Sequence, residues 1–147
     1  MASNFDDVKA FNEKYGILYQ GPPRPLPAEI AEYRIKFMRE ELQEYVEAWQ
    51  NGDLEKQFDA LLDLVYVAMG TAIFHGFPWQ AGWDEVQRAN MSKVRATSAQ
   101  ESKRGSKLDV IKPPGWCSPD LRRVLRLATT CWLANRDDQG AGEHVQE

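Results

Sequence analysis

Hydrophobic residues recur every three or four positions along nearly the whole chain, which is the spacing of amphipathic helices. The longest such run covers residues 27–49 and ends at Asn51-Gly52. A second long run covers residues 53–75, where Asp53 can cap the first turn and Gly76 follows the last. Shorter helices are predicted over residues 5–15, 78–94 and 121–133.

Proline, glycine and polar residues separate these runs. Residues 21–27, GPPRPLP, cannot continue a helix and are expected to form a surface linker. Residues 96–107 are polar and have no apolar period, so a mobile loop is expected there, and no strand pattern is visible. The predicted fold is all-α, a four-helix-like bundle with an added N-terminal and an added C-terminal helix. We expect one domain over residues 1–134 and a polar tail over residues 135–147.

The composition is that of a soluble globular domain. Of the 147 residues, 43% are hydrophobic and 27% are charged, and this length favours a single core. The N-terminus is acidic where a signal peptide would be basic, and the longest uncharged run, residues 64–74, is far shorter than the roughly 20 residues that a bilayer requires. Cys117 and Cys131 suggest neither a metal motif nor a disulfide framework. A cytoplasmic protein without a membrane partner is predicted.

Charge is unevenly distributed along the chain. Residues 28–63 hold ten acidic and four basic side chains, whereas residues 88–126 hold ten basic and three acidic ones. An acidic half beside a basic half would suit a polyanionic ligand that travels with a metal ion. Two solvated surfaces that aid solubility explain the same pattern equally well.

Two pairs of acidic residues lie among the apolar positions of the two long helices: Glu41 with Glu44, and Asp59 with Asp63. Three residues along a helix turn a side chain by about 60° and four by about 40°, so each pair shares one face. If the helices pack antiparallel, the four carboxylates converge, and divalent cations are the usual compensation for so much negative charge. Hard oxygen ligands favour Mg²⁺ or Mn²⁺ over zinc.

Other interpretations of these acidic residues were weighed. A single glutamate on a helix more often lies on a solvated face, but aspartates inside a strongly apolar helix are unusual because aspartate is a poor helix former. A di-iron bundle requires Glu-x-x-His pairs, and neither histidine of the chain follows a glutamate by three positions. The di-iron interpretation therefore fails, and the acidic pairs favour a site for Mg²⁺ or Mn²⁺.

At these motifs the chain resembles a known family. The E-E-x-x-E pattern of Glu40, Glu41 and Glu44, followed by acids in DALLDLVYVA, is similar to the MazG-type all-α nucleoside triphosphate pyrophosphohydrolases. The nearest resemblance is to the phage and bacterial branch related to phosphoribosyl-ATP pyrophosphohydrolase. The later strings RANMSKV and KPPGWCSPDL match in order, so the resemblance covers residues 5–125.

The resemblance implies a role for each acidic residue. Glu41, Glu44 and Asp63 would bind Mg²⁺, with Asp59 as a further ligand, and Glu40 would lie near the attacking water, so that Glu40 and Glu41 are the expected catalytic residues. One departure concerns the second motif. The family's common pattern is E-x-x-D, but Ala60 stands three residues before Asp63, and the nearest acid, Asp59, is rotated by about 100° from that place.

The resemblance also assigns nucleotide contacts in the basic half. Asn90 and Lys93 would contact the phosphate chain from one helical face, and Lys112 would do so from a stiff Lys-Pro-Pro-Gly turn. Trp116 would either pack in the core or stack on a base. Asp120 is expected to act structurally near the start of the last helix.

The implied function is Mg²⁺-dependent hydrolysis of a nucleoside triphosphate, with a purine deoxynucleotide such as dGTP preferred, to the monophosphate and pyrophosphate. The loop before Lys112 would close over the triphosphate. Because the helix over residues 53–75 is apolar on nearly all sides, a homodimer or homotetramer is expected. A non-catalytic metal-nucleotide binding protein is the alternative. A DNA-binding protein is disfavoured because no recognition-helix motif is present.

Overall fold

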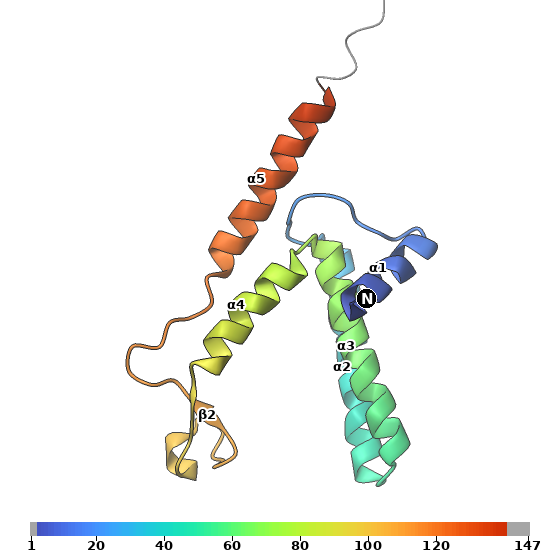
Figure 1. Cartoon of the computed structure of the whole chain (residues 1–147). Coiled ribbons are helices and arrows are strands. Elements are labelled where there is room, and N and C mark those ends of the chain that lie inside the picture. The colour runs from blue at the N-terminus through green and yellow to red at the C-terminus, as the bar shows by residue number, and fades with distance from the viewer. Residues whose placement is uncertain (1–2, 141–147) are drawn as a thin grey trace, which may run out of the picture. The chain divides into compact units, whose positions relative to one another are not determined.

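The computed structural model describes residues 3–140 of the chain, with side chains up to Arg136. Helices dominate this part of the chain, and 66% of the residues are helical, which confirms the all-α prediction. The helices in chain order are α1 (Asn4–Lys14), α2 (Ala28–Gln50), α3 (Leu54–His75), α4 (Trp79–Met91) and α5 (Leu121–Gly140) (Figure 1).

The chain forms two compact units. The first contains the residues up to Phe77 together with those from Thr129 onward, and the second spans Pro78–Ala128. Helices α1, α2 and α3 belong to the first unit, and α4 belongs to the second.

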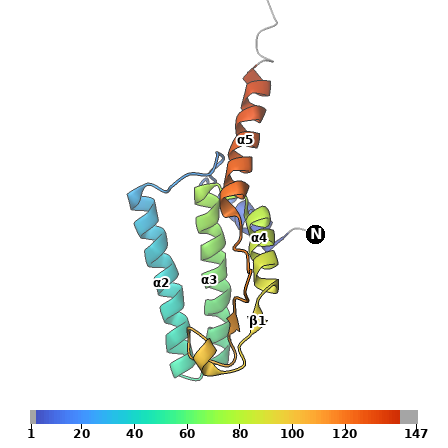
Figure 2. The same ribbon diagram turned by 90° about the vertical axis from the view of Figure 1, so that its left-hand side faces the viewer.

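Local signals close the α2–α3 hairpin. Gly52 follows α2 with a φ of 67°, a left-handed conformation that glycine adopts without strain. Asp53 then caps α3, and its carboxylate accepts a hydrogen bond from the backbone N–H of Lys56 at 3.0 Å. At the far end of α3, Gly76 has a φ of 69° and ends the helix. The predicted bounds of both long helices are confirmed to within one residue, and the two helices lie side by side (Figure 2).

Small and branched side chains form the core of the first unit. Ala48 and Ala60 are buried on α2 and α3. Val67 is buried further along α3, and Val8 of α1 is only 1% exposed. Gly70 of α3 is also buried, and a Cβ built on it would lie 3.0 Å from Nη2 of Arg34 and at ordinary contact distance, 3.8 Å, from Cγ1 of Val8.

Helix α3 is long and apolar enough, by length and composition alone, to cross a membrane, and no other helix of the described residues is. The core helix of a water-soluble protein meets the same criteria. Here α3 packs against both α1 and α2 and carries Asp59 and Asp63 on its surface, and 28% of its most apolar window is buried among the described residues.

The second unit contains a short β-arm where a mobile loop was predicted. Strands β1 (Val94–Arg95) and β2 (Val110–Ile111) pair antiparallel, and a 3₁₀ turn, Ala99–Glu101, lies between them. The expectation of a chain without strands is wrong at this point. Two-residue strands are too short to produce an apolar alternation in the sequence.

A polar network holds the β-arm together. Asp109 accepts hydrogen bonds from Oγ of Ser102 at 2.7 Å and from Nη1 of Arg104 at 2.6 Å. These bonds and the backbone N–H of Val110 hold the pKa of Asp109 below its usual range. Ser102 itself is 8% exposed. The arm is therefore ordered by polar contacts, which hydrophobic periodicity does not detect.

The last helix differs from its prediction at the C-terminal end. Asp120 precedes α5, and its carboxylate accepts the backbone N–H of Arg123 at 3.0 Å, which confirms its structural role. The helix then continues past Leu133 to Gly140, so the first residues of the predicted tail are helical. Residues 141–147 lie outside the described part of the chain.

Candidate functional site

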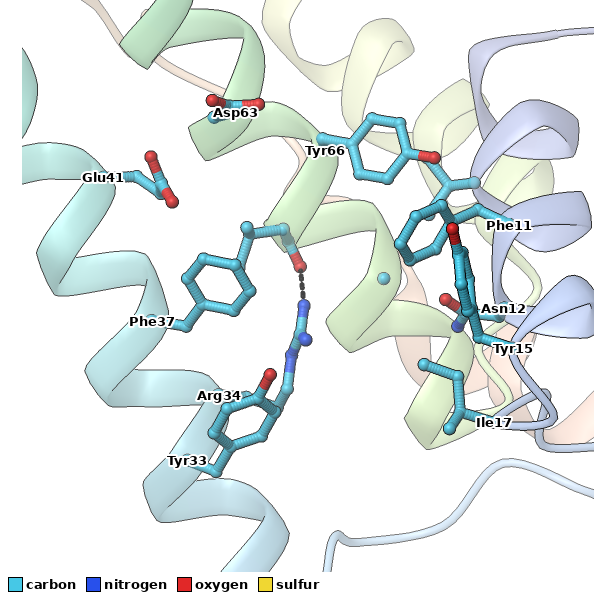
Figure 3. A pocket seen from close by; sticks show the side chains of 13 residues that line it. Phe11, Asn12, Tyr15, Ile17, Tyr33, Arg34, Phe37, Glu41, Asp63 and Tyr66 are labelled. Carbon is cyan, nitrogen blue, oxygen red and sulfur yellow. Dashed lines mark hydrogen bonds between the residues drawn. The ribbon is translucent and has the colours of Figure 1, made fainter.

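The hairpin brings the predicted acidic residues together in pairs. Glu41 on α2 and Asp63 on α3 line one cavity of about 560 Å³ (Figure 3). Glu44 and Asp59 line a second cavity of about 490 Å³, nearer the turn. This pairing follows from antiparallel packing. Glu44 is closer to the turn than Glu41, and it shares a cavity with Asp59, which is closer to the turn than Asp63.

Glu41 differs from the other three acidic residues in its burial. It is 8% exposed, whereas Glu44, Asp59 and Asp63 are all exposed. Burial raises the pKa of Glu41, and the negative charges of Glu44 and Asp63 raise it further, with smaller contributions from Glu40 and Asp59. Burial and the neighbouring negative charges therefore both favour the protonated form of Glu41.

Carboxylate oxygens on facing helices are suitable donors for a hard divalent cation. Within residues 3–136, no three acidic, histidine or cysteine side chains already stand in metal-binding geometry. Because Glu44, Asp59 and Asp63 are exposed, rotamer changes can bring their oxygens inward without displacing core residues. Glu40 lines neither cavity; it is exposed, and its Oε1 lies 3.8 Å from Nζ of Lys36.

The predicted nucleotide contacts form a separate cluster within the second unit. Nζ of Lys93 donates a hydrogen bond to Oδ1 of Asn90 at 2.8 Å. Nζ of Lys112 lies 4.3 Å from the ring centroid of Trp116, and Nζ of Lys93 lies 5.8 Å from the same centroid. The indole N–H of Trp116 donates to the carbonyl of Ala89 at 2.8 Å, which fixes the ring. Four residues named from the sequence therefore form one group, with two ammonium charges over one aromatic ring.

A comparison with known families finds one match. The family described as phosphoribosyl-ATP pyrophosphohydrolase matches residues 8–90, which is more than half of the chain. This chain belongs to the phosphoribosyl-ATP pyrophosphohydrolase family. Membership indicates a pyrophosphohydrolase that acts on a nucleotide, and the all-α structure has the fold type of that family. No curated protein matches the chain in a sequence comparison.

The range that matches the family contains the carboxylates but not most of the predicted nucleotide contacts. All four paired carboxylates lie inside the phosphoribosyl-ATP pyrophosphohydrolase domain, and so does Asn90 at its end. Lys93, Lys112 and Trp116 lie beyond residue 90, and their proposed roles rest on the sequence motifs and on the cluster that they form.

The sequence analysis missed Arg34, which lines the same cavity as Glu41. Arg34 is 7% exposed, and its Nη2 donates to the carbonyl of Val67 at 2.8 Å (Figure 3). Its Nε donates to Oγ1 of Thr71 at 3.1 Å, and burial lowers the pKa of its guanidinium. The available signal was its position between Ile30 and Phe37 on the apolar face of the predicted helix.

Asn12 is a second residue that the sequence did not single out. It lies one helical turn after Val8, on the buried face of α1, and is 3% exposed. A polar residue within an apolar stripe was the only sequence signal. Its burial depends on α1 crossing α3, a contact between segments far apart in the chain.

Proposed function

We propose that this family member hydrolyses a deoxynucleoside triphosphate to the monophosphate and pyrophosphate with the help of Mg²⁺, and that it acts on the nucleotide pool of the cytoplasm. The observation that carries the proposal is the pair Glu41 and Asp63 on facing helices, in a cavity large enough for a nucleotide. The pKa of Glu41, raised first by burial and then by the neighbouring acids, supports it, because a bound cation would stabilise the buried negative charge.

The residues that would hold Mg²⁺ are Glu41, Glu44 and Asp63, with Asp59 as a further ligand. Mn²⁺ could occupy the same oxygen donors. Either ion would lower the pKa of a bound water molecule and neutralise negative charge on the phosphate oxygens. A bound cation would stabilise the charge of Glu41 most, because Glu41 is the buried member of the set.

The chain's own side chains then have distinct tasks. Glu40 precedes Glu41 on α2, is exposed, and is available to accept a proton from the attacking water. Oxygen of that water bonds to phosphorus while the bond between the α- and β-phosphates breaks, which yields a monophosphate and pyrophosphate. Asn90, Lys93 and Lys112 would bind phosphate oxygens, and the concentration of ammonium charge at Trp116 supports that role. A purine deoxynucleotide such as dGTP remains our proposed substrate.

A homodimer or homotetramer is part of the proposal. Several large apolar side chains of α3 are exposed, with Leu54 at 78%, Phe58 at 66% and Leu62 at 55%. On α2, Trp49 is 64% exposed. Monomeric proteins seldom leave so many large apolar side chains of neighbouring helices in water, so a second copy of the chain is expected to cover them.

A non-catalytic protein that binds metal and nucleotide is the second candidate, and one observation favours it. Asp59 lines, together with Glu44, the cavity near the turn rather than the one that holds Glu41 and Asp63, so the four carboxylates are divided between two cavities. A site with fewer ligands could bind a metal-nucleotide complex without positioning the attacking water.

Product analysis separates the two candidates. The protein is incubated with each of the four deoxynucleoside triphosphates and Mg²⁺, and the products are resolved by ion-exchange chromatography. Monophosphate and pyrophosphate in equal amounts, abolished in Asp63→Asn, would support the enzyme. Pyrophosphate from none of the nucleotides would leave only the binding protein, and orthophosphate in place of pyrophosphate would show a different reaction.

A further inference from the structure

Asn12 carries a buried polar group that the fold does not satisfy. The residue is 3% exposed, and its Nδ2 is the one side-chain nitrogen or oxygen of the described residues that is almost completely shielded from solvent and has no hydrogen-bond partner. A buried amide without a partner destabilises the folded state, so this amide is expected to bond to a water molecule or to a ligand in the adjoining cavity.

The amide lies in the wall of the cavity that contains Glu41 and Asp63 (Figure 3). Aromatic rings line much of the remaining wall. They belong to Phe11, Tyr15, Tyr33, Phe37 and Tyr66.

These rings contact one another but keep part of their surface exposed. Phe11 meets Tyr66 edge to face at 5.6 Å and lies 4.6 Å from Tyr15 in a tilted arrangement. Yet Phe11 is 44% exposed and Tyr15 is 57% exposed. Ring faces therefore remain available to stack on a flat aromatic ligand.

The cavity has two chemically different ends. Asp63 marks the carboxylate end on α3, and Gly70, close to Val8 and Arg34, marks the other. Seven residues along a helix span about 10 Å at 1.5 Å per residue, which separates the two ends by enough for an extended ligand. One cavity thus joins a candidate metal centre to an aromatic chamber with an unsatisfied amide.

Arg34 is less available than Asn12 to bind a ligand in this cavity. Its Nη2 and Nε are already bonded to Val67 and Thr71, and its guanidinium carbon lies 5.3 Å from the ring centroid of Phe37. Arg34 therefore helps to fix the wall of the cavity, whereas Nδ2 of Asn12 is the fully buried polar atom of that wall without a partner among the described residues.

We propose that this cavity is the nucleobase subsite, in which the amide of Asn12 hydrogen-bonds to an edge of the base while the aromatic rings stack on its face. The proposal rests on the proposed function, since it places the base of the same nucleotide whose phosphates would lie at the carboxylates. Nucleobase edges present a donor beside an acceptor, and an asparagine amide offers the complementary pair.

Binding of the four deoxynucleoside monophosphates and of inorganic triphosphate, measured by calorimetry on the full chain with Mg²⁺, tests the proposal. Wild type should prefer one base. Asn12→Leu and Asn12→Ala should bind the preferred monophosphate at least about tenfold more weakly, because a hydrogen bond within a buried site is lost, while their affinity for triphosphate stays unchanged. Asn4→Ala, on the exposed start of the same helix, is the matched control and should bind as wild type does.

Stability provides an independent readout. Asn12→Leu removes an unsatisfied amide, so its Tm should equal or exceed that of wild type, whereas a residue with only a structural role would lower it. Phe11→Leu should also weaken the monophosphate while sparing triphosphate, and it decides the question if the Asn12 variants fail to fold.

Three binding results would overturn the proposal, and two further outcomes concern the oligomeric state and turnover. The three are affinities of the Asn12 variants within twofold of wild type, equal loss of affinity for monophosphate and triphosphate, and failure of wild type to bind any of the four monophosphates. A loss of affinity that appears only where the Asn12 variants also change oligomeric state would assign the cavity to a subunit contact instead. Base-selective binding without turnover would refute only the proposed function. Turnover that is the same in wild type and in the Asn12 variants would refute only the proposed nucleobase subsite.

Discussion

Replacement of Glu41 by glutamine should stabilise the metal-free protein at neutral pH. Glu41 is 8% exposed, and no described side chain donates a hydrogen bond to it or pairs with its charge. Burial and the neighbouring acids raise its pKa, so the folded protein holds the proton more tightly than the unfolded chain does. Stability of the metal-free wild type should therefore fall as pH rises from the ordinary glutamate pKa through the raised one, and stay lower above it.

The size of the effect follows from the surroundings of the carboxylate. An unsatisfied buried group destabilises the folded state by about 1–3 kcal/mol. Glu41 lines an open cavity that admits water, so the lower end applies, about 1 kcal/mol. The gain in Glu41→Gln should appear near pH 8 and vanish near pH 4, where both side chains are neutral.

Urea unfolding followed by far-UV circular dichroism, with a chelator present, measures this difference. Glu32→Gln is the matched control, because Glu32 is exposed on the same helix and should show little change at either pH. Addition of Mg²⁺ at 100 times its Kd should then stabilise wild type by about 2.7 kcal/mol and the variant by much less. The order of stabilities should reverse on adding metal. A variant less stable than wild type without metal at pH 8, or equal stabilisation of both by Mg²⁺, would refute the reasoning.

Three further predictions concern other parts of the chain. Gly70→Ala should destabilise the protein by about 1 kcal/mol, although alanine is the better helix former, because its Cβ would lie 3.0 Å from Nη2 of the anchored Arg34. Gly82→Ala should instead stabilise the protein by up to about 1 kcal/mol, because the nearest neighbouring atom would lie 3.9 Å from its Cβ. Chemical denaturation would show whether the two changes in stability have opposite signs. Lys112→Met should raise the KM for the triphosphate by about tenfold with kcat little changed, and an equal KM in steady-state kinetics would remove Lys112 from the site. Phe58→Asp should shift the protein toward monomer in size-exclusion chromatography with light scattering, because Phe58 is 66% exposed on the apolar surface of α3, and an unchanged mass would exclude it from a subunit contact.

Features set by neighbouring residues could be predicted from the sequence. The ends of α3 depend on Asp53 and Gly76, whose capping and left-handed geometry act within a single turn. Opposition of Glu41 and Asp63 follows once a short turn makes the two helices antiparallel. The helical periodicity and the acidic spacing therefore contained most of the information about the hairpin.

Features set by distant contacts could not be predicted. Burial of Asn12 requires α1 to cross α3, and Arg34 is anchored by atoms more than thirty positions away along the chain. The β-arm is held by Asp109 and its polar partners, which leave no apolar period. In each case a polar residue is placed by tertiary contacts, and hydrophobic patterning reports only apolar burial.

Anomalous scattering from Mn²⁺, in crystals grown with a non-hydrolysable deoxynucleoside triphosphate, would locate the metal ion and the phosphates together. We expect a manganese peak bound by oxygens of Glu41, Glu44 and Asp63, in contact with the phosphates. A peak bound by other side chains, or a triphosphate bound with no ion at Glu41 and Asp63, would contradict it.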